Sequence, residues 1–316
     1  MKTLTLFLLA LFLISSCQIT DRESISANMR EQLQKLPQES SIIGYVNLTK
    51  LKSSSVYDLF KGDVEDEIME HDEYQEFLEI TGFDLEKDLH EIYFAALSLD
   101  KKSDQNGIFM ASGSFSPDKI IAYIREQDRD EELFSESFNQ FTLYYFDKNN
   151  LYFCFKDENT IIGGSRDLVI KILSDDKPGV KPNLMPQIES LKYKNWAWMT
   201  MSTESFLSRM QDHGISERLP VVKSIKNASM AFKLTDNLYF NGECVCADNE
   251  KAELLKDTVK GAISAAKLSV SDDRDTIDIL NRIDVRAKNN LLIADGEMTE
   301  TDIKKLIAQK NKVMSI

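Results

Sequence analysis

Few residues of this chain have the types and spacing that catalysis or metal binding requires. Its three histidines, His71, His90 and His213, stand far apart, and none lies within four residues of a cysteine or of another histidine. Zinc sites depend on such close pairs of ligands. No serine belongs to a G-x-S-x-G sequence, nor to an S-x-x-K sequence with its partner motifs. We therefore predict no catalytic residues, no metal site and no cofactor.

The sequence Gly163-Gly164-Ser165-Arg166 comes nearest to an anion-binding loop. Backbone amides at the start of a helix, with an arginine beside them, can bind a phosphate or a carboxylate. The lysine and the spacing of a P-loop are missing. Two interpretations stay open: a tight turn from a strand into a helix with Ser165 as the N-cap, or contact of Ser165 and Arg166 with an anion.

The segment from Asp63 to Glu79 has nine carboxylates and no lysine or arginine. Paired carboxylates can perform acid–base catalysis, as in glycosidases. However, Val64, Tyr74 and Phe77 give the segment an apolar stripe at helical spacing, which puts the carboxylates on a solvated face where their pKa values shift little. We predict an amphipathic helix, with weak binding of a divalent cation or docking to a basic partner as alternatives.

Two pairs of residues lie two apart on expected strands, and each pair therefore shares a face. Trp196 and Trp198 could stack on a sugar ring or pack in the core. Cys244 and Cys246 could hold a soft metal, but they lack the second pair of ligands that a structural zinc site needs. We expect them and Cys154 to be buried free thiols that act as small apolar residues.

The beginning of the chain predicts export and attachment to a membrane. Lys2 precedes an apolar run over residues 4–14, and small residues then lead to Cys17, as in a secretory signal peptide. The run is too short to span a bilayer. It resembles a bacterial lipoprotein signal, which implies that Cys17 is lipidated and anchors the mature chain in the membrane. Gln18 in place of an aspartate favours the outer over the inner membrane; an ordinary signal peptide with a chance cysteine is the alternative.

Composition restricts the remaining function classes. The 316 residues are 42% hydrophobic and 28% charged, as in a globular protein, and the net charge is −14. An acidic surface repels nucleic acids, so we expect no nucleic-acid partner. No second apolar stretch is long enough to cross a membrane.

Four stretches show a strand pair followed by a capping residue and a helix, with the caps at Ser116, Ser165, Asp248 and Thr299. The first two caps are 49 residues apart and the last two 51. Strands before Thr49 and Thr203 also run into helices. This spacing predicts a duplication, in which the first half has about 20 extra residues near 63–89.

Hairpin turns dominate the strand connections, which predicts an α+β fold of mostly antiparallel sheets with helices packed on one face, in two related tandem halves. A stretch rich in proline near residues 175–186 separates the halves. We expect a signal peptide at residues 1–17, a tether with a short helix at 18–36, a first half at 37–176, a linker at 177–194 and a second half at 195–316.

Three segments resemble a family of bacterial envelope proteins of unknown function. Residues 40–48 are similar to its opening strand, residues 81–89 to its recurrent turn, and Gly113-Ser114-Phe115 to the approach to its capped helix. The resemblance implies a duplicated α+β body on a lipid anchor, and it brings no catalytic residues.

These observations favour a non-catalytic binding or scaffolding module of the bacterial envelope, attached to the membrane through Cys17, with an envelope protein as a candidate partner. The alternative is a hydrolase of envelope glycans that uses an unrecognised carboxylate pair. Pockets tend to form between adjoining units. We therefore expect any ligand near residues 175–195 and not on the acidic helix.

Overall fold

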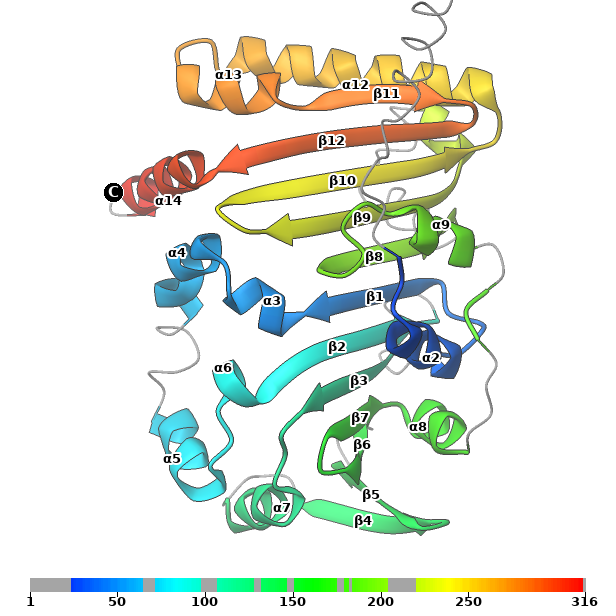
Figure 1. Ribbon diagram of the computed structural model, residues 1–316, viewed down its shortest axis with the longest axis vertical. Helices are drawn as coiled ribbons and strands as arrows, with labels where there is room; N and C mark the ends of the chain where they lie inside the picture. The colour runs from blue at the N-terminus through cyan, green and yellow to red at the C-terminus, as the bar shows by residue number, and fades with distance from the viewer. Residues whose placement is uncertain are drawn as a thin grey trace, which may run out of the picture.

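The computed structural model describes residues 24–64, 72–97, 107–127, 132–146, 151–174, 179–181, 184–203 and 220–314. The predictions for the signal peptide, Cys17, His71 and His213 concern residues outside these ranges. The described strands form one antiparallel sheet of 12 strands in the order β11-β12-β10-β9-β8-β1-β2-β3-β7-β6-β5-β4 (Figure 1). The predicted α+β class with antiparallel pairing is therefore confirmed.

The first half contributes seven strands to this sheet. Its elements are α2 (Ala27–Lys35), β1 (Ile42–Asn47), α3 (Leu48–Lys52), α4 (Ser55–Val64), α5 (Asp72–Thr81), α6 (Leu85–Asp88), β2 (Leu89–Ala96), β3 (Gly107–Gly113), α7 (Pro117–Glu126), β4 (Leu133–Phe138), β5 (Phe141–Phe146), β6 (Leu151–Asp157), β7 (Thr160–Gly164) and α8 (Arg166–Leu173).

The second half contributes five strands. Its elements are α9 (Met185–Ser190), β8 (Ala197–Ser202), the 3-10 helix η2 (Pro220–Ser224), β9 (Ile225–Leu234), β10 (Asn237–Cys246), α12 (Asn249–Ser269), α13 (Arg274–Asn281), β11 (Asp284–Lys288), β12 (Leu291–Thr299) and α14 (Glu300–Met314).

Both halves have the same strand connectivity. The order β1-β2-β3-β7-β6 in the first half matches β8-β9-β10-β12-β11 in the second, and the hairpin β4–β5 is extra material at the outer edge of the first half. The two halves meet where β1 pairs with β8, so they share one continuous sheet. Asn47 N donates to the carbonyl oxygen of Trp196 at 2.6 Å, and Ser202 N donates to that of Ser41 at 2.8 Å. The two bonds are equivalent. Ser202 follows Asn47 by 155 residues and Trp196 follows Ser41 by 155 residues, so exchanging the halves turns each bond into the other.

The same separation relates α2 to α9. Met29, Leu33 and Leu36 of the α2 segment are buried, and so are their counterparts 155 residues later, Leu184, Ile188 and Leu191. The helix expected in the tether at 18–36 thus lies in the core of the body. We infer that each repeat begins with this helix, ahead of the expected boundaries at residues 37 and 195.

Helices cover the sheet in separate places. The main core lies between one sheet face, with Ile43 and Tyr93, and the helices α2, α8 and α9 (Figure 1). A second core lies on the opposite face, where α12 packs on β10, β11 and β12 through side chains such as Leu255 and Leu292. A third, aromatic cluster joins α5 and α7 to the sheet beside Phe115. Each core thus has its helices on one face of the sheet, as predicted. Taken together, the described helices cover both faces.

Candidate functional site

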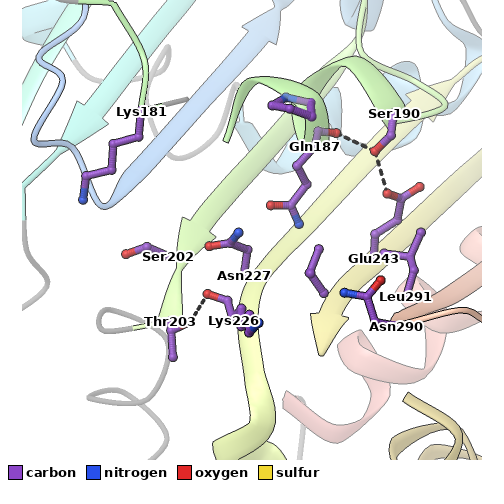
Figure 2. A pocket seen from close by; sticks show the side chains of 12 residues that line it. Lys181, Gln187, Ser190, Ser202, Thr203, Lys226, Asn227, Glu243, Asn290 and Leu291 are labelled. Atoms are coloured by element: carbon purple, nitrogen blue, oxygen red, sulfur yellow. Dashed lines mark hydrogen bonds between the residues drawn. The ribbon is translucent and has the colours of Figure 1, made fainter. Parts of the chain in front are cut away.

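A cavity of about 700 Å³ lies between α9 and the second half of the sheet (Figure 2). Its size is within the range of small-molecule sites. It borders the segment at residues 175–195, where we expected a pocket. The lining residues are Lys181, Pro186, Gln187, Ser190, Ser202, Thr203, Lys226, Asn227, Glu243, Val245, Asn290 and Leu291.

Four neighbouring strands supply the floor of this cavity. Ser202 of β8 pairs with Asn227 of β9, Asn227 pairs with Val245 of β10, and Val245 pairs with Leu291 of β12. Directly paired residues project from the same face of a sheet. The sheet therefore presents one row in which two polar side chains are followed by two apolar ones.

Helix α9 supplies the opposite wall through Gln187. This side chain is almost fully buried, with 5% of its surface exposed. Gln187 Oε1 accepts a hydrogen bond from Thr200 Oγ1 at 3.3 Å, and the amide end is directed toward Asn227 (Figure 2). Gln187 Nε2 has no hydrogen-bond partner in the part of the chain that the structure describes, and the same holds for Ser202 Oγ. Buried polar atoms without partners destabilise a fold unless a ligand or a water satisfies them.

Charged groups lie both inside the cavity and at its rim. Glu243 is 5% exposed, and its Oε2 lies 2.9 Å from Ser190 Oγ. Lys226 is exposed and Lys181 half-buried, so their ammonium groups belong to the rim. The cavity thus combines a positive rim, neutral donors on its walls and one carboxylate inside.

A second cavity, of about 650 Å³, lies in the first half beside Asn47, Glu91 and Ser112. Tyr45 Oη donates to Glu91 Oε1 at 2.9 Å, and Tyr93 Oη lies 3.3 Å from Oε2. Burial, followed by the charge of Glu91, raises the pKa of both tyrosines. The two hydroxyls therefore stay protonated and act as donors to this carboxylate.

The structure places Ser165 at the N-cap position of α8, directly after β7, as the turn interpretation predicts. A side chain on Gly164 would overlap the backbone of β3, so close strand packing accounts for this glycine. Arg166 Nε is 2.7 Å from Glu136 Oε1 on β4. Contact of Ser165 and Arg166 with an anion stays a prediction, and such an anion would compete with Glu136.

The acidic segment forms a helix where it is described. In α5, Phe77 packs against Phe83 and Tyr123, while Glu73, Glu76 and Glu79 are exposed. This agrees with the predicted amphipathic helix. Residues 65–71 lie outside the described part, and cation binding or a basic partner remains untested.

The tryptophans and cysteines take mostly structural positions. Trp198 is buried and donates from Nε1 to the Lys194 carbonyl oxygen at 2.8 Å, whereas Trp196 is partly exposed beneath Lys50. The described cysteines Cys154, Cys244 and Cys246 are free thiols. Burial raises the pKa of Cys154 to about 11 and that of Cys244 to about 12. Both thiols are thus protonated and act as small apolar residues, as expected.

The described residues contain no group of three or more histidine, cysteine or acidic side chains arranged to hold a metal ion. None of the described helices combines the length and apolar character needed to cross a membrane.

The cavity borders the segment near which we expected a ligand, but it lies within the second half and not between the two units, and sequence reasoning missed most of the residues that line it. Their signal is a change in polarity between the repeats. The inward positions of β8 to β10 carry Thr200, Ser202, Asn227, Ser229 and Glu243. In the first half the corresponding positions hold Tyr45, Asn47, Glu91, Tyr93 and Met110, so the difference in polarity and size lies at Thr200, Ser229 and Glu243. Only alignment of the two repeats by strand register shows this difference.

No protein-family model and no curated protein matches the chain. Among solved structures, it is similar to TP0453 in crystal form III, with a TM-score of 0.47 and 10% identity over 88% of this chain and 97% of that chain. Crystal form IV of TP0453 gives a TM-score of 0.49 and 10% identity over 87% and 95%, respectively. Crystal form I gives 0.45 and 9% identity over 88% and 96%.

Proposed function

We propose that this protein is a non-catalytic binding protein of the bacterial envelope, and that its ligand occupies the cavity beneath α9. The observation that carries this proposal is the pair of buried polar atoms without partners, Gln187 Nε2 and Ser202 Oγ, on the walls of a cavity of about 700 Å³. A bound polar molecule would satisfy both atoms and would offset the cost of burying them.

The location rests on the sequence. A lipid on Cys17 would hold the body at a membrane, and Gln18 favours the outer over the inner one. An envelope protein is a second candidate partner. Helix α2 is packed in the core, so the chain between Cys17 and the body is short. The cavity would then lie close to the membrane surface.

A glycan hydrolase receives no support from the cavity. Both retaining and inverting glycosidases use a pair of carboxyl groups flanking the bond that is cleaved. Among the described residues that line this cavity, Glu243 is the one carboxylate. Binding without turnover is therefore the better account of the site.

The test uses the full chain purified in detergent. The protein is incubated with a low-molecular-weight extract of the cells, separated from unbound material, and analysed for retained compounds by mass spectrometry. Ser202→Leu fills part of the cavity and should abolish retention. Ser112→Leu makes the same change beside the cavity of the first half and should leave retention intact. Retention of nothing, or equal retention by both variants, would contradict the proposal.

A further inference from the structure

The two cavities occupy equivalent places in the repeats. Asn47 ends β1 and pairs with Glu91, and Ser202 ends β8 and pairs with Asn227. Asn47 and Ser202 also make the two exchanged backbone bonds across the β1–β8 pair. Glu91 and Asn227 are therefore counterparts.

One row further along the strands, the counterparts differ strongly in size. Tyr45 pairs with Tyr93 in the first half, and Thr200 pairs with Ser229 in the second. The two tyrosine rings stand 4.8 Å apart and lean toward the row of Asn47 and Glu91. The small hydroxyl side chains of the second half instead bond each other at 2.9 Å. The short side chains of Thr200 and Ser229 thus leave the row of Ser202 and Asn227 to the cavity. In the first half, the tyrosines extend toward the equivalent row of Asn47 and Glu91.

In the first half, a carboxylate of the protein itself lines the equivalent cavity. The Glu91 carboxylate lies there, within hydrogen-bond distance of Tyr45 Oη, Tyr93 Oη and Asn47 Nδ2, the last at 3.0 Å from Oε1. In the second half the carboxylate is replaced by the amide of Asn227. The donors remain, now supplied by Gln187 Nε2 and Ser202 Oγ, and these two have no acceptor in the described part of the chain.

We propose that the cavity beneath α9 binds a small carboxylic acid, whose carboxylate takes the place that Glu91 holds in the first half. This inference rests on the proposed binding function and names its ligand class. Gln187 and Ser202 donate to the carboxylate, and Lys226 at the rim adds favourable charge. Hydrogen bonds to an ionised group are about twice as strong as those between neutral groups.

Glu243 restricts the rest of the ligand. It pairs with Ser229 and lies one row away from Asn227 on the same face, at a strand distance of about 7 Å. A buried carboxylate accepts hydrogen bonds but cannot donate them. A ligand group that approaches Glu243 must therefore be a donor, such as an ammonium or a hydroxyl group. Amino acids and hydroxy acids combine such a donor with a carboxylate, whereas neutral sugars have hydroxyl groups but no carboxylate.

The experiment measures binding to the full chain in detergent by isothermal titration calorimetry. The probes are the proteinogenic L-amino acids together with lactate, malate and citrate, each compared with its methyl ester. At least one acid should bind, and its ester should not. The amino acids and the hydroxy acids form separate arms, which decide whether the donor is an ammonium or a hydroxyl group.

Gln187→Glu provides the sharpest variant, because it keeps the shape of the side chain and replaces the Nε2 donor by a carboxylate oxygen. We expect it to weaken binding of the acid by about tenfold or more. The matched control is Gln38→Glu, which makes the same change at an exposed position and should leave the affinity unaltered. Asn227→Glu restores the carboxylate of the first half and should abolish binding.

Three outcomes would overturn the inference: equal binding of acid and ester, unchanged affinity of the Gln187→Glu variant, or failure of every acid to bind. If every acid fails while a neutral compound is retained from the cell extract and lost in Ser202→Leu, the binding function stands and the ligand class is wrong. If Asn227→Glu does not fold, as judged by circular dichroism, the decision rests on Gln187→Glu.

Discussion

Ser229 Oγ donates a hydrogen bond of 2.9 Å to Thr200 Oγ1 across the β8–β9 pair. In the other repeat the same pair of positions holds two tyrosine rings. Thr200 also donates to Gln187 Oε1, so one short chain of side chains fixes the amide whose Nε2 atom lies in the cavity. The orientation of Gln187 in the cavity wall thus depends on Thr200 and Ser229, which do not line the cavity.

Ser202→Ala should leave the free energy of unfolding unchanged or raise it by up to about 1 kcal/mol, because the hydroxyl that is removed is buried without a partner. Thr200→Val removes a hydroxyl with three hydrogen-bond partners and should lower the free energy of unfolding by roughly 1–2 kcal/mol. Urea denaturation of the two variants without ligand measures both values. A loss of stability in Ser202→Ala equal to that in Thr200→Val would mean that Ser202 has a partner.

Two glycines should respond to alanine with opposite signs. A methyl group on Gly164 would overlap the backbone of Gly107 and Ile108, so Gly164→Ala should lower stability by about 1–3 kcal/mol. Gly261 lies in α12, is exposed and has nothing near the site of a new side chain. Gly261→Ala should therefore raise stability by about 0.5–1 kcal/mol through helix propensity. Thermal unfolding of both variants at one pH tests the pair, and the same sign for both would refute the packing argument.

Asp302 should make stability depend on acid pH. Its burial alone would raise the carboxyl pKa, but hydrogen bonds from Thr299 and the charges of Arg282 and Lys305 outweigh this, and the pKa is lowered from its ordinary 3.8. The carboxylate therefore stabilises the fold above about pH 4, and this contribution disappears as pH falls through the folded-state pKa.

The variant Asp302→Asn should lose roughly 1–2 kcal/mol at pH 7 and progressively less below pH 4. Chemical denaturation from pH 7 down to pH 3, with wild type measured in parallel, gives the difference at each pH. A difference that stays constant over this range would show that the ionised carboxyl group is not the source of the stability.

If Cys17 carries the proposed lipid, Cys17→Ser should block its attachment, because the Cys17 sulfur would be the atom that is acylated or alkylated. We expect the variant to leave the fraction that needs detergent for extraction, or to keep its signal peptide. Membrane fractionation and intact-mass measurement distinguish these results from wild type. A normally processed variant that stays in the membrane fraction would disprove the lipoprotein assignment.

Local signals predicted much of the fold. Asp248 caps α12 by accepting a hydrogen bond from Lys251 N at 2.8 Å, and Thr299 and Asp302 bond each other reciprocally at the start of α14. The extra residues expected in the first half are also present. Equivalent residues are 155 apart at β1 and β8 but 136 apart at Glu91 and Asn227. Caps and turns are short-range features, which is why the sequence reveals them.

Long-range features escaped the sequence. The sequences of Ile42–Asn47 and Ala197–Ser202 do not indicate that these strands pair with each other, because each could pair with other strands equally well. The hairpin β4–β5 and the use of both sheet faces were likewise not anticipated. The position of the Gln187 amide depends on Thr200 and Ser229, which stand where the first half has tyrosines. This difference becomes visible only once the register of both repeats is known.

The β1–β8 pair has a consequence for the ancestry of this chain. A single copy of the repeat would end its sheet at the first strand, with a row of unpaired backbone groups. Two such copies could cover that edge by pairing their first strands antiparallel about a twofold axis, as symmetric homodimers do. The present chain has this arrangement within one polypeptide. A fusion of two such copies would let them diverge, and the positions of Tyr45 and Tyr93 in the first half indeed hold Thr200 and Ser229 in the second.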